Sequence, residues 1–436
     1  MEESHEILKD PVHGYIRLYN HEREIIDTPI FQRLRHVKQL TAVDYAYPGA
    51  VHTRFSHSIG VMHVAGVFAE RLLEKIPKLS QSQRQHYYYL MRLWGLVHDI
   101  GHGPFSHLFD DIVLGPRESS HETVGAKIVK TDPDLTRIKL PWGITNSELS
   151  SIIQSDEEWP LTEQLGNGPT TARIFRYVCT GAYSADIIDY LLRDSLFTGA
   201  GYGAIDWQRL IGLSQPEKNR VVLSYKAEDA FDSFLLARLF MFSTVYYHRT
   251  VRAFTKVAAW FLRDLEQREP PFFDEYVDND YERYSQLSDP TLIPEMLSGE
   301  SQFGKMLIHR KSPYSTVDEI SLPIISLAQT EYLDADIMTR AVSEASRLSL
   351  PPEAFFVDTP KIQFNPMLRE QKIHIKDVDG KIRERNVRET RWGALSMQMG
   401  VARLYIHDAH VKHASRLKRA FRKPTTSHSR KKRTFY

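Results

Sequence analysis

The stretch "LVHDIGHGPFSHLFD", residues 96–110, decides how the chain is interpreted. Its three histidines and two aspartates begin where the apolar positions of a predicted helix over 84–100 end. Gly101, Gly103 and Pro104 stop that helix. Imidazole and carboxylate groups bind divalent metals and transfer protons, so their concentration at one helix end predicts a metal-dependent or acid–base site.

A second periodic helix is predicted over 57–76, and a short polar connector, "PKLSQSQ", separates it from the helix that ends in this stretch. Helices joined so briefly pack as antiparallel neighbours, about 8–10 Å apart. His57 begins the first helix, and His98 and Asp99 end the second. The antiparallel arrangement therefore brings two imidazoles and a carboxylate together, close enough to share one ion.

A fourth ligand is expected from "SADIIDYLLRD", residues 184–194, where Asp186, Asp189 and Tyr190 share one helical face. The flanking isoleucines and leucines predict that this helix is buried, and a buried carboxylate needs a cation or several hydrogen-bond donors. Either aspartate could instead form a salt bridge with an arginine such as Arg193. For one aspartate taken alone, that structural role is the more common one.

The composition is that of a folded protein of 436 residues with 42% hydrophobic content. The single cysteine, Cys179, excludes an internal disulfide and predicts a reducing compartment, the cytoplasm. The first residues, "MEESHEILKD", are acidic and lack an apolar signal segment. No run approaches ~18 uncharged apolar residues, so no membrane contact is expected.

The formal net charge of +1 is unevenly distributed along the chain. From Lys412 to the end there are ten Lys and Arg residues and no acid, which leaves a net charge of −9 for the rest. Such a tail is either a solvated, disordered segment or a contact surface for nucleic acid. Both interpretations stay open from the sequence.

The remaining pattern predicts a mainly α protein with a smaller C-terminal α+β lobe. Helices are expected over three further segments, 22–41, 171–197 and 228–266. The sequence predicts a helical core over 1–270, an acidic and aromatic connecting loop over 271–304, the α+β lobe over 305–420 and a basic, disordered tail over 421–436. Within the lobe, a hairpin over 372–386 that turns at Asp379-Gly380 and a strand over 401–407 are expected.

With these residues together, the sequence resembles the HD-domain phosphohydrolases, and more closely the deoxynucleoside triphosphate triphosphohydrolases. The resemblance covers about residues 8–205, with weaker likeness through about 262. The blocks that carry it occur in the family's order and are "DPVHGYI", "DTPIFQRLRHVKQL", "YPGAVHTRFSHSIGV", "GLVHDIGHGPFSHLFD" and "DYLLRDSLFTGAGYG".

The resemblance implies that one metal is bound by His57, His98, Asp99 and Asp186. This His₂Asp₂ set suits Mn²⁺, Fe²⁺, Ni²⁺, Co²⁺ or Zn²⁺, with Mg²⁺ as a possible second ion. A bound cation of this kind lowers the pKa of water toward neutrality, which suits attack on the α-phosphorus of a nucleotide. A second group is implied beside the substrate phosphates, with His107 and its partner Asp110 as the general acid: His102, His107, Asp110 and His121.

The resemblance also implies how substrate is selected. Arg54 would contact phosphate, Gln39 and Leu40 would read the sugar, and Tyr190 would crowd the position of a ribose 2′-hydroxyl. The remaining substrate contacts implied are Asp194, Arg238 and Tyr246. The expected products are a deoxynucleoside and inorganic triphosphate.

Two departures from the family pattern affect these expectations. Ile187 stands where relatives have a phosphate-binding lysine, and Glu6 stands where relatives have a lysine that binds the phosphates of an activating nucleotide. The residues that match the family's activator site are Asp27, Gln32 and Arg35. Activation by a nucleotide and assembly into a dimer or tetramer are therefore family expectations that this sequence only partly supports.

Three functions remain open from the sequence. The first is a deoxynucleoside triphosphate triphosphohydrolase. The second is another HD-type phosphohydrolase, such as a nucleotide monophosphatase or a phosphodiesterase acting on nucleic acid. The third is a regulator that binds nucleotides or nucleic acid with little turnover.

Overall fold

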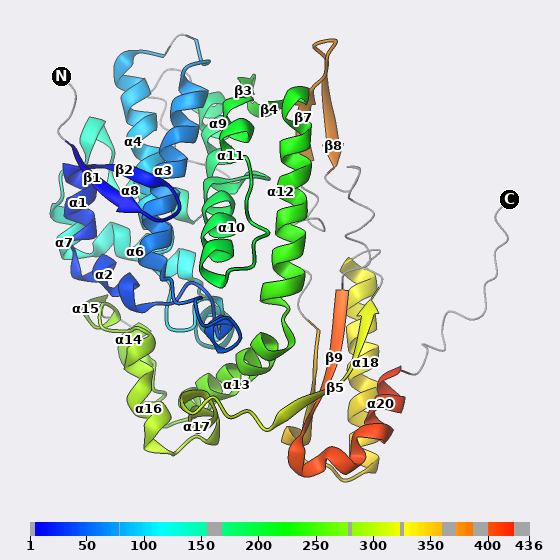
Figure 1. The fold of residues 1–436 in the computed structure, drawn as a ribbon. Coiled ribbons are helices and arrows are strands. Elements are labelled where there is room, and N and C mark those ends of the chain that lie inside the picture. Colours follow the sequence, from blue (N-terminus) through cyan, green and yellow to red (C-terminus); the bar gives the residue numbers. More distant parts are fainter. Residues whose placement is uncertain are drawn as a thin grey trace, which may run out of the picture. The chain divides into compact units, whose positions relative to one another are not determined.

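The computed structural model describes residues 5–77, 79–154, 168–277, 281–322, 327–359, 372–386 and 400–422. Over these residues the chain is mainly α-helical with short strands, as predicted (Figure 1). It divides into two compact units. The first comprises Met1–Arg310 with Gln371–Thr390, and the second comprises Lys311–Glu370 with Arg391–Tyr436.

The first unit is built mostly from helices. Its longer helices are α3 (Arg54–Leu73), α4 (Gln81–Val97), α6 (His121–Thr131), α8 (Asn146–Ile153), α9 (Gly168–Thr180), α10 (Ala185–Thr198), α12 (Glu228–Met241) and α13 (Arg249–Glu266). Its shorter helices are α1 (Asn20–Ile26), α2 (Pro29–Gln32), α5 (His107–Phe109), α7 (Pro133–Arg137), α11 (Trp207–Gly212), α14 (Asp274–Val277), α15 (Tyr281–Tyr284), α16 (Ile293–Ser298) and α17 (Gln302–Ile308).

Two small sheets accompany these helices. Strands β1 (His5–Asp10) and β2 (Gly14–Tyr19) form an antiparallel hairpin. The second sheet has the order β3-β4-β7-β8, in which β4 and β7 are parallel and the other pairs antiparallel. Its strands are β3 (Ser214–Glu217), β4 (Arg220–Ser224), β7 (Lys372–Lys376) and β8 (Ile382–Asn386).

Helices α3 and α4 pack against each other at the centre of the first unit (Figure 1). Their inward residues are fully buried, as the periodicity predicts: Val61, Val64, Leu90 and Leu93. A side chain at Gly95 would lie 2.8 Å from the backbone of Met62, so the glycine permits the close approach of the two helices. Ser80 caps α4 in a reciprocal arrangement with Gln83, which fixes where the helix begins.

Three of the predicted long helices are interrupted. The segment 22–41 forms α1, α2 and a 3₁₀ turn that ends at His36, because the chain then becomes extended and Lys38 pairs with Thr53. The segment 171–197 breaks before Ser184, whose side chain caps α10. The segment 228–266 breaks before His248, which caps α13 in the same way. Local capping groups thus overrode the apolar periodicity on which the prediction rested.

The segment 271–304 was expected to form a loop, but in its described part it carries α14, α15, α16 and the start of α17. Phe273, Tyr284, Leu287 and Leu292 are fully buried. These four side chains therefore belong to the core of the first unit.

The second unit has a three-stranded antiparallel sheet in the order β5-β9-β6, formed by β5 (Tyr314–Leu322), β9 (Gly400–His407) and β6 (Phe355–Asp358). Helices α18 (Leu327–Arg347) and α20 (Ala414–Arg422) pack with it around a common core. Strand β9 corresponds to the strand predicted over 401–407.

The hairpin predicted over 372–386 is present, and Gly380 at its turn has a left-handed φ of 80°. The sequence predicts this hairpin in the C-terminal lobe, whereas β7 pairs with β4 and so belongs to the first unit. The tail beyond Arg422 lies outside the described residues. Among the helices that the structure describes, none is both long and apolar enough to cross a membrane.

Candidate metal centre and active site

Four side chains from three helices meet at one end of the α3–α4 pair. His57 lies in the first turn of α3, His98 and Asp99 follow the last turn of α4, and Asp186 lies in the first turn of α10. His57 Nε2 is 3.1 Å from Asp186 Oδ1 and 3.5 Å from Asp99 Oδ2. His98 Nε2 is 3.3 Å from Asp99 Oδ1 and 4.0 Å from Asp186 Oδ1. Atoms that each lie about 2.0–2.2 Å from one ion have spacings of this size.

The hydrogen bonds of His57 and His98 use Nδ1 of each ring and leave Nε2 able to bind a metal. His57 Nδ1 donates to Asp189 Oδ2 at 2.8 Å, and His98 Nδ1 donates to the carbonyl of Gly95 at 2.9 Å. Because these partners only accept, each Nε2 keeps its lone pair. Both Nε2 atoms are buried and have no hydrogen-bond partner among the described residues. The donor set therefore fits a divalent cation.

The charges around His57 also favour a cation. Burial alone would lower the pKa of His57, but the close carboxylates of Asp186 and Asp189 and the charges of Asp189 and Asp99 raise it to about 10. Burial opposes ionisation of Asp99, yet the Arg54 guanidinium and the nearby histidines hold its pKa well below the usual range. The three carboxylates around His57 thus favour a proton or a metal ion at this site.

Helix α10 gives its two aspartates different roles. Asp186 keeps 38% of its side chain exposed and faces His57 and His98. Asp189 is fully buried and forms paired hydrogen bonds of 2.9 Å with Arg193. The salt-bridge alternative weighed from the sequence therefore holds for Asp189, while Asp186 has the position of a ligand.

A buried network behind His57 escaped the sequence reasoning. His13 Nε2 donates to Asp189 Oδ1 at 2.6 Å, and Arg193 Nη1 donates to Asp10 Oδ2 at 3.0 Å. A side chain at Gly60 would lie 1.9 Å from Asp189 Oδ1, so the glycine makes room for this carboxylate. The signal that could have found Asp10 and His13 was their place in the block "DPVHGYI".

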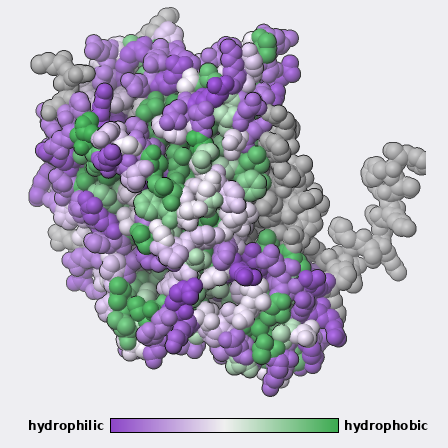
Figure 2. All heavy atoms as spheres, in the orientation of Figure 1, coloured by the Kyte–Doolittle hydropathy of each residue, from purple (hydrophilic) through white to green (hydrophobic). Residues whose placement is uncertain are grey.

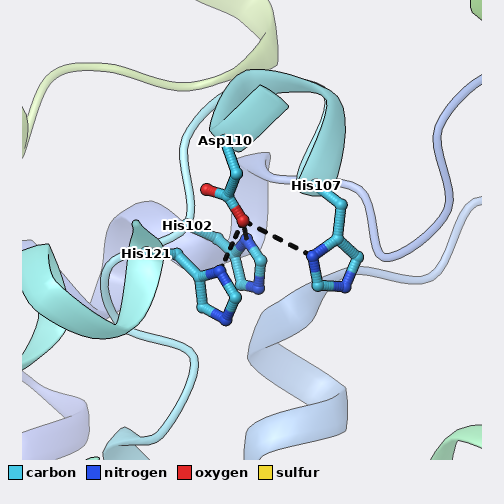
Figure 3. Close-up of side chains that lie close together, drawn as sticks. All are labelled: His102, His107, Asp110 and His121. Atoms are coloured by element: carbon cyan, nitrogen blue, oxygen red, sulfur yellow. Dashed lines mark hydrogen bonds and ion pairs between the residues drawn. The ribbon is translucent and has the colours of Figure 1, made fainter. Parts of the chain in front are cut away.

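A second cluster of polar side chains adjoins the first (Figure 3). The carboxylate of Asp110 points toward three imidazoles: its Oδ2 is 2.5 Å from His121 Nδ1, 3.5 Å from His107 Nδ1 and 4.0 Å from His102 Nδ1. The rings of His102 and His121 stack with centroids 3.7 Å apart. Asp99 joins the two clusters, because its Oδ1 is 3.3 Å from His102 Nε2.

The three histidines of this cluster differ in charge and exposure. Burial, Arg54 and His121 together hold the pKa of His102 well below its ordinary value, so this ring is neutral. Burial also opposes a charge on His121, but its hydrogen bond to Asp110 and the carboxylate's charge raise its pKa. The side chain of His107 is 55% exposed. The cluster therefore combines a neutral ring, a charged ring and a solvent-accessible ring.

The chain after α4 is held by side chains that bind its carbonyl groups. Arg33 donates to the carbonyl oxygens of His102 and Ile100, both at 2.7 Å, and the hydroxyl of Tyr284 donates to that of Gly101 at 2.6 Å. Carbonyls at a helix C-terminus lack helical partners, so these bonds fix the direction in which the chain leaves α4. Gly101 also allows α6 to approach, since a side chain there would lie 2.1 Å from the His121 carbonyl oxygen.

Four of the predicted substrate residues lie together: Tyr190, Asp194, Arg238 and Tyr246. The Tyr246 hydroxyl donates to Asp194 Oδ2 at 2.5 Å, and His52 Nε2 donates to Asp194 Oδ1 at 2.8 Å. Burial raises the pKa of Tyr190 to about 12, so its hydroxyl stays protonated. His52, which is buried in this group, was not singled out from the sequence.

The other three predicted substrate residues are Gln39, Leu40 and Arg54, which precede His57 in the sequence. Arg54 is buried, donates to Asp99 Oδ2 and, through Nε, donates to the hydroxyl of Ser106 at 2.9 Å. Gln39 and Leu40 are half-buried, and Gln39 Oε1 has no hydrogen-bond partner among the described residues. A phosphate contact by Arg54 stays a prediction.

The predicted activator residues lie around α2. Gln32 donates to the Ile26 carbonyl at 2.8 Å and accepts from Arg35 Nε at 2.7 Å, and Asp27 is exposed. Arg23 donates to Glu6 Oε1 at 2.5 Å. The structure places these side chains at the surface without showing what they bind.

Comparison with known proteins agrees with this geometry. Residues 54–191 match the HD domain and residues 205–384 match the HD associated region. An uncharacterized protein of Methanocaldococcus jannaschii, MJ1154, is 33% identical over 60% of this chain and 50% of its own length. The deoxynucleoside triphosphate triphosphohydrolase SAMHD1 homolog of Dictyostelium discoideum is 30% identical over 73% of this chain and 61% of its own.

The fold is shared with a solved structure, a hypothetical protein of Aquifex aeolicus. It is 25% identical, and the superposition covers 96% of this chain and 100% of that chain with a TM-score of 0.71. This chain spans about half to three-fifths of the length of these two curated relatives. An HD domain followed by its associated region, with His57, His98 and Asp99 gathered at one end of α3 and α4 and Asp186 beside the two histidines, identifies the chain as a member of the HD-domain phosphohydrolase family.

Proposed function

We propose that this protein hydrolyses deoxynucleoside triphosphates to a deoxynucleoside and inorganic triphosphate. One observation carries the proposal: Asp99 Oδ1 is 3.3 Å from both His98 Nε2 and His102 Nε2, so a metal centre directly adjoins a histidine cluster suited to phosphate. The likeness to a triphosphohydrolase of Dictyostelium discoideum supports the choice of substrate class.

The cation would be held by His57, His98, Asp99 and Asp186. Imidazole and carboxylate ligands in equal number suit Mn²⁺, Fe²⁺, Ni²⁺, Co²⁺ or Zn²⁺, and Mg²⁺ would accompany the phosphates. Such a cation supplies a Lewis acid and lowers the pKa of a bound water toward neutrality. Asp189 and the Gly95 carbonyl keep the two imidazoles in the orientation that this role needs.

The second cluster would bind and protonate the phosphate groups. His121, whose pKa the Asp110 carboxylate raises, would neutralise a phosphate oxygen, and His102, stacked on its ring, would lie beside the phosphates. His107 lies at the exposed edge within 3.5 Å of Asp110, so it can exchange protons with solvent and protonate the leaving 5′-oxygen.

The cluster of Tyr190, Asp194, Arg238 and Tyr246 would receive the nucleoside and its phosphates. Asp194 is held by His52 and Tyr246, which leaves Tyr190 beside it to crowd a ribose 2′-hydroxyl. Gln39 would complete the sugar contact, since its carbonyl oxygen is buried without a partner among the described residues. This arrangement would favour deoxyribonucleotides.

A homo-oligomer in the cytoplasm is part of the proposal. Leu196, Tyr202 and Phe240 are 52%, 44% and 42% exposed, and the rings of Tyr202 and Phe240 lie 5.3 Å apart. Figure 2 shows apolar side chains gathered on the face in view among hydrophilic ones. Exposed apolar groups of this kind often mark a surface that another subunit covers. Contact of nucleic acid with the basic tail is a separate proposal that rests on charge alone.

The test is to incubate the purified protein with Mn²⁺ and each deoxynucleoside triphosphate, dGTP included, with and without added nucleotides as activators. Phosphorus NMR and chromatography should show inorganic triphosphate and the deoxynucleoside. Release of single phosphate from monophosphates, or cleavage of single-stranded nucleic acid, would favour another HD-type phosphohydrolase. Absence of any product would contradict the proposal. Asp134→Asn changes an exposed carboxylate on α7 and should give the same products as the wild-type protein.

A further inference from the structure

Asp289 joins two loops that are distant in the sequence. It opens the 3₁₀ turn Asp289–Leu292, in the segment whose packing the sequence reasoning missed. Its Oδ1 accepts a hydrogen bond from the Phe105 backbone N–H at 2.9 Å, and its Oδ2 accepts one from the Lys38 backbone N–H at 3.0 Å. A single carboxylate thus uses one oxygen for each loop.

The first loop carries the exposed histidine of the second cluster. Phe105 and Ser106 have φ values of 60° and 54°, in the left-handed region that residues other than glycine rarely adopt. His107 follows immediately. Because this backbone conformation is unfavourable, outside contacts must hold it. Asp289 supplies one at the Phe105 N–H, and the Thr41 hydroxyl supplies another by donating to the Phe105 carbonyl at 2.5 Å.

The second loop carries Gln39, for which we propose a sugar contact. Lys38 precedes it, and both backbone polar groups of Lys38 are used: the N–H by Asp289 and the carbonyl by the Ser106 hydroxyl, which donates to it at 2.7 Å. Gln39 N–H donates to the His52 carbonyl at 3.1 Å. The two loops therefore contact each other directly, and Asp289 adds a second link between them.

We propose that Asp289 is a positioning residue that sets the distance between the general-acid loop at His107 and the sugar-reading loop at Gln39. Asp289 touches the two backbones through its carboxylate and acts on the substrate only through them. The inference rests on the proposed function for the roles of these loops. Its structural part, a shared hold on two backbones, rests on the hydrogen bonds alone.

Asp289→Asn tests this with little change in shape. An amide has one accepting oxygen and one donating nitrogen, so one of the two backbone N–H groups would face another donor. We expect kcat to fall roughly 10- to 100-fold, as a displacement of about 1 Å does in other sites. The preference for deoxy- over ribonucleotides, measured as a ratio of kcat/KM values, should fall as well. Metal content should stay at the wild-type level.

Hydrogen exchange provides a readout that does not depend on catalysis. Peptides covering 37–41 and 103–107 should both exchange faster in Asp289→Ala, which removes both accepting oxygens, whereas a peptide within α3 should not change. Thr41→Val, which removes only the bond to the Phe105 carbonyl, should loosen 103–107 with a smaller loss of kcat. The control is Glu300→Gln, whose side chain is 70% exposed and pairs with Arg268, and it should leave every readout unchanged.

The outcomes separate this inference from the proposed function. If the wild-type protein hydrolyses nucleotides while Asp289→Asn keeps its kcat, its sugar preference and the protection of both loops, Asp289 has no positioning role. Faster exchange in only one of the two loops of Asp289→Ala would also overturn the shared hold. If both loops loosen but the wild-type protein yields no deoxynucleoside, the proposed substrate is wrong and the hold on the two loops stands.

Discussion

His57 Nδ1 lies 2.8 Å from Asp189 Oδ2, and this relationship decides which nitrogen of His57 can bind a metal. Asp189 is itself too deeply placed to be a ligand, because its two oxygens are already used by Arg193, His13 and His57. It acts as the outer partner that holds the ring and increases the basicity of Nε2. The hydrogen bonds that hold His57 thus continue through Asp189 to His13 in the N-terminal hairpin.

Asp189→Asn should weaken metal binding roughly 10- to 100-fold, the usual effect of losing such an outer partner. The change removes the charge beside His57 while the amide keeps almost the same shape. The measurement is a titration of the metal-free protein with Mn²⁺, run in parallel on Asp134→Asn. Equal affinities for the wild-type protein and Asp189→Asn would show that the outer partner is not needed.

The double change of His98→Ala with Asp99→Asn should abolish both metal content and hydrolysis. It removes one of the two imidazoles and the charge of the carboxylate that joins the two clusters. The fold should survive, because α3 and α4 pack through apolar residues such as Val61 and Leu93. Elemental analysis together with circular dichroism checks this. An unchanged ion in the folded variant would refute the ligand assignment.

The proximity of three of the proposed ligands was predictable because it follows from helix geometry. The short connector and the periodicity of two helices were enough to place His57 near His98 and Asp99. The different roles of Asp186 and Asp189 were not predictable, since both residues lie on one face of α10. Only the positions of Arg193 and His13 show which carboxylate is already satisfied. Arg193 is close in sequence, but His13 comes from a hairpin whose packing no local pattern reveals.

Tyr246→Phe should lower kcat/KM for a deoxynucleoside triphosphate by about 10- to 150-fold, which corresponds to about 1.5–3 kcal/mol for a hydrogen bond to a charged group. The hydroxyl donates to Asp194 Oδ2, and its loss frees Asp194 beside Tyr190. Metal content should not change, because Tyr246 contacts no metal ligand. Tyr225→Phe, at an exposed position, is the control. An unaltered kcat/KM would show that Tyr246 does not contribute to the substrate site.

His86 should make stability depend on pH at a site remote from the metal. Its Nδ1 lies 2.9 Å from the Trp142 carbonyl and its Nε2 lies 3.0 Å from Glu148 Oε1, so both nitrogens donate and the ring is charged. Burial opposes this charge, but Glu148 outweighs it and raises the pKa of His86. The stabilisation is therefore complete below the ordinary histidine pKa of about 6.5 and is lost as pH rises through the raised value.

The corresponding measurement is the free energy of unfolding in urea for the wild-type protein and His86→Gln between pH 6 and pH 9. The difference between them should be largest near pH 6 and shrink as the pH rises. His309→Gln, at an exposed position, should show no such trend. A difference that grows with pH would reverse the assigned charge.

The fold beyond the two central helices was less predictable than the site. The apolar periodicity of 171–197 and 228–266 was correct, but Ser184 and His248 each start a new helix through a side-chain cap. The acidic and aromatic composition of 271–304 suggested a loop. Buried contacts of Tyr284, Leu287 and Asp289 with residues 33–38 and 101–105 reverse that prediction, and they arise from parts of the chain more than 180 residues apart.

The most direct test of the central claim is to find the ion itself. A crystal of the protein grown with Mn²⁺ should give an anomalous diffraction peak about 2.0–2.2 Å from His57 Nε2, His98 Nε2 and oxygens of Asp99 and Asp186. The same peak should be absent from crystals of the double variant His98→Ala with Asp99→Asn. A peak only among His102, His107, Asp110 and His121, or none at all in a catalytically active sample, would contradict the assignment.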